Sequence, residues 1–201
     1  DTNTRGFHHC VYEIVDNSVD EALAGHCDTI TIQKHSDNSM SITDNGRGIP
    51  VGVNGEHGIP AIRLVFEDLH AGGKFGGGGS EVSGGVHGVG ATVTNALSEY
   101  LTVHVKRDGK LHEMRYEKGI PVGDLTVIGE VPEGETGTMV RFKPDDSMFP
   151  EAFDEEGNTN LSVSLIRERI KRTAYLTPRL RLVIIDEDGT KAEFYSENGI
   201  I

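Results

Sequence analysis

The stretch EIVDNSVDEALAG, residues 13–25, decides the first element of the fold. Apolar residues recur in it and just upstream at steps of three and four, which is typical of an amphipathic helix with one face toward a core. These residues are Phe7, Val11, Ile14, Val15, Val19, Ala22 and Leu23. Gly25 is well placed to end the helix, because glycine adopts the left-handed conformation of a helix C-terminus without strain.

Polar residues on the same helix form a second pattern. Glu13, Asn17 and Glu21 are spaced by four, so they share one stripe of the helix surface. Asp16, Asp20 and Arg47 are possible partners. An isolated E-x-x-x-N is most often a solvated helix face, so this spacing alone does not assign a function.

The rest of the chain places helices between hairpins. Ile30 and Ile32 alternate with threonines, and Met40 and Ile42 alternate with serine and threonine, which predicts a hairpin that leads into Asp44. Further strands are predicted over 101–107, 110–117, 124–129 and 137–142, with a hairpin of 180–186 and 190–195. Helices are predicted over 59–69, 86–97 and about 160–176, and residues 72–90 are too rich in glycine for a regular element.

This order predicts an α+β fold, because the helices interrupt hairpins instead of alternating strictly with strands. The expected architecture is a two-layer sandwich, with a mixed, mainly antiparallel sheet and its helices on one face. With 201 residues, the chain is expected to form one domain over 1–201.

The composition is that of an acidic, soluble protein. Its 36% hydrophobic and 25% charged residues are ordinary, and its apolar runs are too short to span a bilayer. The formal charge of −13 would repel a phosphate polymer unless a local basic patch compensated. Cys10 and Cys27 form no metal-ligand cluster, which favours a reducing cytoplasm. Without an initiator Met or a signal sequence, the chain is interpreted as an excised fragment.

The segment DNGRGIP, residues 44–50, is the first candidate for a ligand site. A strand stops at Asp44, and glycines then let the backbone turn closely around whatever the carboxylate holds. Such a carboxylate accepts a hydrogen bond from an exocyclic amine like that of adenine. The alternative is an ordinary surface turn, which D-x-G-x-G also fits.

Two glycine-rich segments, LHAGGKF at 69–75 and SGGVHGVG at 83–90, form the second candidate. Exposed amides at a helix N-terminus bind anions, and Lys74 can add a positive charge for a terminal phosphate. A lone glycine-rich stretch is usually only a loop. Thr136-Gly137-Thr138 enters a strand, and its second hydroxyl could support Asp44.

Taken in order, E-x-x-x-N, D-x-G-x-G, G-x-H-G-x-G and the late G-T resemble the four motifs of the GHKL superfamily. This superfamily comprises the ATPases of gyrase, the heat-shock chaperone, histidine kinases and MutL, with the Bergerat ATP-binding fold. The segments EIVDNSVDEALAG, DNGRGIP, LHAGGKF, SGGVHGVG, TNALS and TGTMVRF are similar almost letter for letter to the gyrase B and topoisomerase IV branch. The resemblance covers nearly the whole chain and is weakest over 145–201.

The resemblance implies an ATP and Mg²⁺ site. It makes Glu13 the general base that polarises the attacking water, and it gives the amide oxygen of Asn17 to Mg²⁺. Asp44 would take the adenine amino group, Thr138 would fix a shared water, and Gly48 would let the ring approach. The remaining implied nucleotide-binding residues are Lys74 and the amides of Gly88, Val89 and Gly90 at the phosphates, the Glu21–Arg47 ion pair beside the base with Ile49 and Pro50, and Arg107 at the pocket mouth.

The resemblance also implies what the complete protein does. It would be a bacterial type II topoisomerase subunit that couples ATP hydrolysis to DNA strand passage and supercoiling, with the gyrase A subunit and DNA as partners and ATP-dependent homodimerisation. Coumarin antibiotics would compete with ATP at Asp44 and Arg107. The fragment lacks the transducer domain and most of the N-terminal arm of this family, so it is expected to be a cytoplasmic monomer that binds ATP and hydrolyses it slowly.

One departure and three alternatives remain. Between Phe75 and Val82 the chain reads Gly-Gly-Gly-Gly-Ser-Glu, where the family usually carries Tyr-Lys at Ser80-Glu81, so 76–81 is either a natural flexible lid or an engineered linker. Topoisomerase IV fits the same motifs as gyrase. A histidine-kinase catalytic domain would use the same pocket, and a binding module without catalysis would leave Glu13 a surface charge.

Overall fold

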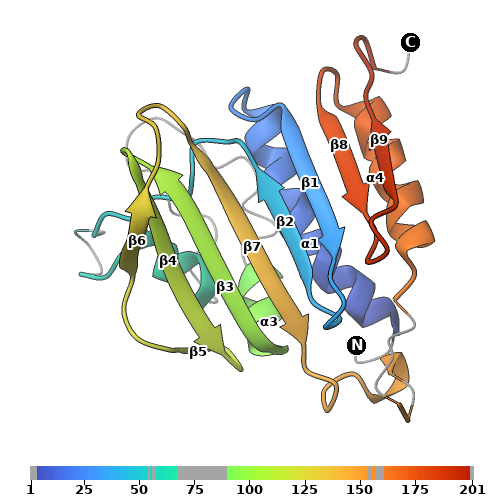
Figure 1. Cartoon of the computed structure of the whole chain (residues 1–201), viewed down its shortest axis with the longest axis horizontal. Helices are drawn as coiled ribbons and strands as arrows, with labels where there is room; N and C mark the ends of the chain where they lie inside the picture. The colour runs from blue at the N-terminus through green and yellow to red at the C-terminus, as the bar shows by residue number, and fades with distance from the viewer. Residues whose placement is uncertain are drawn as a thin grey trace.

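The computed structural model describes residues 4–53, 55, 58–67, 90–153, 155–156 and 161–199. It forms one twisted sheet with the order β5-β4-β3-β7-β2-β1-β8-β9, and β6 also pairs with β4 (Figure 1). The strands are β1 Thr29–Lys34, β2 Met40–Asp44, β3 Ser98–Arg107, β4 Lys110–Glu117, β5 Ile120–Pro121, β6 Thr126–Glu130, β7 Gly137–Pro144, β8 Arg181–Ile185 and β9 Lys191–Phe194.

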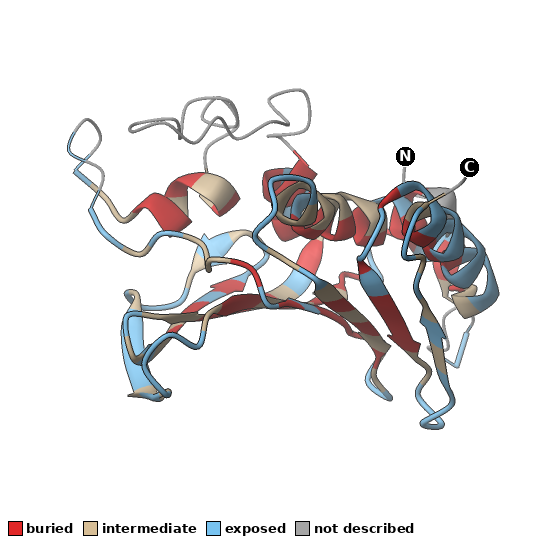
Figure 2. Ribbon diagram, turned by 90° about the horizontal axis from the view of Figure 1, so that it is seen from above, coloured by how far each residue is buried: buried red, intermediate tan, exposed pale blue. Residues whose placement is uncertain are grey.

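The helices lie together on one face of this sheet, as Figure 2 shows. They are α1 Thr4–Leu23, α2 Ala61–Glu67, α3 Gly90–Ala96 and α4 Val163–Leu176, with a 3-10 turn, η1, at Pro150–Ala152. Among the described strands, only β1 and β8 pair in parallel, and the other strand pairs are antiparallel. The predicted α+β two-layer sandwich with a mixed, mainly antiparallel sheet is confirmed.

The core lies between the helices and the inner face of the sheet. Phe7, Val11 and Ile14 of α1 are buried against inward residues such as Ile30 and Ile42. Each apolar side chain of this size contributes about 1.5–3 kcal/mol when it is fully buried. α1 ends as predicted, because Gly25 adopts a φ of +85°.

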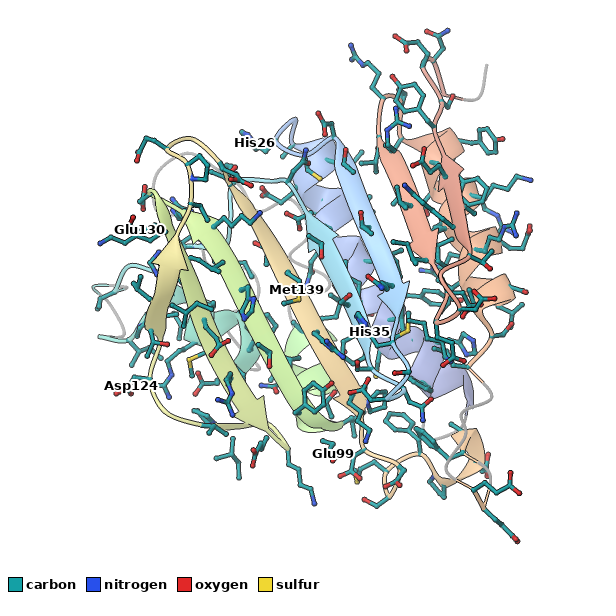
Figure 3. All side chains as sticks on the ribbon, viewed as in Figure 1. His26, His35, Glu99, Asp124, Glu130 and Met139 are labelled. Atoms are coloured by element: carbon teal, nitrogen blue, oxygen red, sulfur yellow. The ribbon has the colours of Figure 1, made fainter. Side chains whose placement is uncertain are left out.

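The opposite face of the sheet is polar and open. Met139 lies near its centre, on the side turned toward the viewer in Figure 3. Polar side-chain contacts lie on this face, including His104 of β3 with Glu113 of β4 at 2.7 Å and Lys106 of β3 with Glu135, just before β7, at 2.9 Å. Exposed pairs of this kind contribute about 0–1 kcal/mol each, so the helix side supplies most of the folding energy.

Several predicted boundaries were wrong. α4 begins at Val163, because Ser162 is extended and its Oγ accepts a hydrogen bond from the Leu165 N–H, which makes it the N-cap. β3 begins at Ser98 instead of 101, and β7 extends to Pro144 instead of 142. β5 and η1 were not predicted. The helices predicted over 59–69 and 86–97 are present as α2 and α3, and positions 68–69 and 86–89 lie outside the described residues.

No helix within the described part of the chain combines the length and the apolar character needed to cross a membrane.

Candidate functional site

A pocket of about 300 Å³ lies between α1 and the inner face of the sheet. This volume is at the lower end of the range for small-molecule sites. The described residues that line it come from α1, β2 and the turn after it, α2, β3 and β7. They are Ile14, Asn17, Ser18, Asp20, Glu21, Ala24, Ile42, Asp44, Arg47, Gly48, Ile49, Pro50, Ala61, Val65, Phe66, Arg107, Thr138 and Val140.

Asp44 forms the polar end of this pocket. It is the last residue of β2, paired with Ile30 of β1 and Thr138 of β7, and only 9% of it is exposed. Its Oδ2 accepts a hydrogen bond from the Ser18 Oγ at 2.6 Å, and its Oδ1 accepts one from the Gly46 N–H at 3.0 Å. Burial raises the pKa of Asp44, although the Ser18 hydrogen bond opposes that rise.

The turn after β2 is held tightly against β3 and β7. Gly48 has a φ of +81°, and a Cβ on it would come within 2.9 Å of the Lys106 carbonyl oxygen. The Gly48 carbonyl accepts a hydrogen bond from Arg107 at 2.8 Å, and the Thr138 Oγ1 accepts one from the Ile49 N–H at 3.1 Å. Glycine is therefore required at position 48 by the backbone conformation and by close packing on β3.

Glu21 and Arg47 form the predicted ion pair at one side of the pocket. The Arg47 Nη2 lies 2.7 Å from Glu21 Oε1, and the Arg47 backbone N–H donates to Oε2 at 3.1 Å. Burial alone would raise the pKa of Glu21, but the hydrogen bonds from Arg47 lower it below its ordinary value. Glu21 is therefore ionised at neutral pH, and it fixes the turn that carries Arg47.

Glu13 lies one turn of α1 before Asn17, where α1 meets α3. Its Oε1 is 3.1 Å from the His9 Nε2, and its Oε2 is buried without a hydrogen-bond partner among the residues that the structure describes. A Cβ at Gly90 would collide with this carboxylate. A buried carboxylate oxygen without a partner is costly, so its position indicates a group that ligand or solvent completes.

The structure brings most of the predicted site residues together. Nine of them line the pocket, namely Asn17, Glu21, Asp44, Arg47, Gly48, Ile49, Pro50, Arg107 and Thr138. Glu13 and Gly90 face each other at the contact of α1 with α3. The other three, Lys74, Gly88 and Val89, lie outside the described residues.

The sequence analysis missed two polar residues and the apolar wall of the site. Ser18 hydrogen-bonds Asp44, and His9 contacts Glu13. A helical projection would have placed His9 four residues before Glu13, on the same stripe. The apolar wall is made by Ile14, Ile42, Ala61, Val65, Phe66 and Val140.

No cluster of three or more His, Cys, Asp or Glu side chains able to hold a metal ion is present in the described ranges. Mg²⁺ often binds through one or two protein oxygens together with substrate phosphates and waters. The single amide oxygen of Asn17, which lines the pocket, fits that mode of Mg²⁺ binding.

Comparison with known proteins points to one family. The family model described as "Histidine kinase-, DNA gyrase B-, and HSP90-like ATPase" matches residues 2–148. The DNA gyrase B subunit of Halalkalibacterium halodurans is 49% identical over 201 residues, which cover 99% of this chain and 30% of that protein. The DNA topoisomerase 4 B subunit of Bacillus subtilis is also 49% identical over 201 residues, which cover 99% of this chain and 29% of that protein.

A solved structure has the same fold. The crystal structure of the 43K ATPase domain of Thermus thermophilus gyrase B, in complex with an aminocoumarin, matches with a TM-score of 0.85 and 40% identity, over 100% of this chain and 49% of that chain. The chain thus spans under a third of the length of the Halalkalibacterium halodurans and Bacillus subtilis proteins. With most of its length matched by the family model, the chain belongs to the family of histidine kinase-, DNA gyrase B- and HSP90-like ATPases.

Proposed function

We propose that this chain is the ATP-binding and ATP-hydrolysing domain of a bacterial type II DNA topoisomerase of the gyrase B type. In the complete protein, ATP binding and hydrolysis would drive DNA strand passage and supercoiling. The observation that carries the proposal is the buried, unpartnered Oε2 of Glu13 within the described part of the chain, which lies on the same helix as the pocket residues Asn17 and Glu21.

Asp44 recognises the adenine ring. An ionised carboxylate accepts a hydrogen bond from the 6-amino group of adenine, whereas guanine has a carbonyl oxygen at that position. A hydrogen bond to a charged group is worth about 1.5–3 kcal/mol, so this contact favours adenine by roughly 10- to 150-fold. Thr138 holds a shared water beside Asp44. The apolar wall, which includes Ile42 and Val140, packs against the adenine ring.

The triphosphate extends from the pocket toward the contact of α1 with α3. Lys74 and the backbone amides of Gly88, Val89 and Gly90 would hold its phosphates, and the amide oxygen of Asn17 would hold Mg²⁺. The similarity of these segments to the gyrase B branch supports this assignment. Mg²⁺ neutralises the phosphate charge when it is bound.

Glu13 is the general base. Its Oε2 accepts a proton from the attacking water, and His9 keeps the carboxylate oriented through Oε1. A well-positioned general base contributes roughly 10²–10⁴-fold to a rate. A binding module without catalysis gives no role to the buried, unpartnered Oε2 of Glu13 within the described residues.

The remaining parts of the proposal concern the complete protein. Its partners are the gyrase A subunit, DNA and a second copy that dimerises on binding ATP, in the cytoplasm. By similarity to the Thermus thermophilus gyrase B domain, the pocket also takes a coumarin that competes with ATP. The chain covers under a third of the length of its relatives, and the 201-residue chain alone is expected to be monomeric and to hydrolyse ATP slowly.

Two variants test the proposal. Calorimetric titration with a non-hydrolysable ATP analogue and with a coumarin should show competing binding, and Asp44→Asn should weaken both by at least about ten-fold. In the complete subunit, Glu13→Ala should retain analogue binding and lose hydrolysis by roughly 10²-fold or more. Retained hydrolysis in Glu13→Ala, or no nucleotide binding by the parent chain, would overturn the proposal.

Topoisomerase IV is the second candidate, because the Bacillus subtilis protein is as similar to this chain as the gyrase protein is. The pocket is shared by the two enzymes, so it does not separate them. A supercoiling assay and a decatenation assay, each with the complete subunit and its partner subunit, distinguish the two functions.

A further inference from the structure

Positive charge is concentrated in one short part of this acidic chain. Residues 161–181 hold six of the 19 Lys and Arg residues and only one of the 32 Asp and Glu residues, while the chain as a whole carries −13. Four of the six lie on α4, namely Arg167, Arg169, Lys171 and Arg172. Such segregation is the electrostatic footprint of a polyanion partner.

The fold turns this charge toward solvent. α4 buries Ile166, Ile170 and Ala174, and its four basic residues are all exposed. In Figure 2 the outer side of α4, at the C-terminal end of the helix layer, is largely exposed. Because the buried residues recur every four positions, the basic residues lie on the solvent side of the helix, which they share with the exposed residues Ser164, Leu165, Glu168, Tyr175 and Leu176.

Packing uses two of these cations, Arg167 and Arg169, and leaves Lys171 and Arg172 available. The Arg167 guanidinium lies over the Phe194 ring of β9, 5.9 Å from its centroid. The Arg169 guanidinium stacks on the Tyr12 ring at 4.0 Å and lies 3.7 Å from the Asp16 carboxylate, so it anchors α4 to α1. No carboxylate within the described ranges lies at ion-pair distance from Lys171 or Arg172. Tyr175 is exposed one turn after Lys171 and adds a hydroxyl that can donate to a phosphate.

We propose that the outer face of α4, defined by Arg167, Lys171, Arg172 and Tyr175, binds the phosphate backbone of duplex DNA in the complete protein. This inference rests on the proposed function, since the relatives are DNA topoisomerase subunits. Lys and Arg that face phosphates release counterions from DNA, and this supplies affinity without reading sequence. The acidic remainder of the chain repels DNA, which directs a duplex to this face.

The α4 face is separate from the nucleotide pocket. Arg169 contacts Tyr12 and Asp16 of α1, whereas the same helix lines the pocket with residues that include Asn17, Ser18 and Glu21. The proposed DNA surface therefore lies across α1 from the pocket. Variants on it should change DNA binding and leave nucleotide binding intact.

The test measures DNA affinity of the complete subunit as a function of salt. Fluorescence anisotropy with a labelled duplex, between about 50 and 200 mM salt, gives the slope of log K against log salt. Replacing Lys171 and Arg172 together by Ala should reduce the magnitude of this slope by about 1.8, or about 0.9 for each phosphate that is no longer neutralised. Affinity at about 100 mM salt should fall at least about ten-fold.

A matched control removes the same charge elsewhere. Lys110 and Arg115 are both exposed on β4, which lies toward the end of the sheet opposite α4. Figure 3 labels Asp124 and Glu130 at this same end of the sheet. Replacing Lys110 and Arg115 by Ala should leave the slope within error of the parent. Thermal unfolding monitors the fold, and the pair Lys171→Gln with Arg172→Gln replaces the Ala pair if the latter is unstable.

Three results would overturn the proposal. The first is an unchanged slope in both α4 variants, and the second is an equal change of slope in the control variant. The third is binding of a labelled acidic peptide, but not of the duplex, by the parent protein, which would identify an acidic protein as the partner. Calorimetry with a non-hydrolysable ATP analogue on the same proteins distinguishes failure of the α4 inference from failure of the proposed function. Failure of the proposed function would appear there as absent nucleotide binding in the parent, whereas failure of the α4 inference leaves that binding intact.

Discussion

The pKa of Asp44 determines the pH range in which this proposed adenine-binding residue is ionised. Burial raises the pKa of this carboxyl above its ordinary value, and the Ser18 hydroxyl opposes the rise. The ionised acceptor is present above the pKa of the folded protein and disappears as pH falls through it. Nucleotide binding should therefore weaken at a higher pH than the ordinary pKa of an aspartate implies.

Ser18→Ala should move this acid limit further upward, because it removes an interaction that lowers the pKa of Asp44. Titration of a non-hydrolysable ATP analogue from mildly acidic to neutral pH measures the shift. Ser41→Ala is the control, since Ser41 is a buried serine of β2 that hydrogen-bonds His35 instead. An identical pH profile in Ser18→Ala and the parent protein would refute the role given to Ser18.

Gly90 illustrates a glycine retained for space. Replacing glycine by alanine within a helix usually stabilises a protein by about 0.5–1 kcal/mol. At Gly90 the new Cβ would collide with the Glu13 carboxylate, so Gly90→Ala should displace the proposed general base. We expect hydrolysis by the complete subunit to fall at least about ten-fold, toward the loss of a general base.

The matching control for Gly90→Ala is Gly52→Ala, where a Cβ meets nothing within 4 Å. This variant should hydrolyse ATP at the rate of the parent. Steady-state ATPase assays on the three proteins decide the question. Parent-like activity in Gly90→Ala would show that Glu13 has room to move without consequence.

Among the elements, α3 supports α2, which forms one wall of the pocket. The Asn95 Nδ2 donates to the Phe66 carbonyl at 3.1 Å, and the Thr92 Oγ1 donates to the Val65 carbonyl at 3.3 Å, so side chains of α3 satisfy the last carbonyls of α2. Asn95 is buried, and Asn95→Ala would remove its hydrogen bond to the Phe66 carbonyl. The expected cost in the free energy of unfolding is about 1–3 kcal/mol, measured by urea denaturation.

Asn198→Ala, at an exposed position near the C-terminus, serves as the comparison for Asn95→Ala and should change stability by less than about 0.5 kcal/mol. Equal stabilities of the two variants would mean that α2 does not depend on α3 for its C-terminal cap.

The elements also show why some of the fold was predictable. α1 and the hairpin of β3 and β4 were predicted because their periodic hydrophobic patterns extend over many residues. The turn of the hairpin was predicted because Asp108-Gly109 readily adopts the positive φ angles that it requires. β5 and η1 are two or three residues long and carry no period. The parallel pairing of β1 with β8 joins strands separated by a long stretch of sequence, and only the global packing selects it.

The candidate site divides in the same way. Asp44, Gly48 and the Glu21–Arg47 pair belong to short motifs, which made them predictable from the sequence. Ser18 and His9 act through single hydrogen bonds or ion contacts, which have no repeating pattern. The apolar wall could not be predicted from the sequence, because an apolar residue that lines a pocket and one that fills the core have the same chemistry.

For the whole molecule, net charge predicts the response of stability to salt. Most of the ion pairs that the structure describes have at least one exposed side chain. Pairs with both side chains exposed contribute about 0–1 kcal/mol each, so screening them costs little. The charge of −13 repels itself in the compact state, and salt relieves that repulsion. The melting temperature should therefore rise when sodium chloride is increased from about 10 to about 150 mM, as the screening length falls from about 30 to about 8 Å.

Differential scanning calorimetry across this range provides the measurement. The double variant Glu117→Gln with Glu130→Gln removes two exposed negative charges, so it should melt above the parent at low salt and gain less from added salt. A melting temperature that falls with salt would mean that ion pairs such as Lys34–Glu187, where the lysine side chain is only 8% exposed, stabilise the fold by more than its net charge destabilises it.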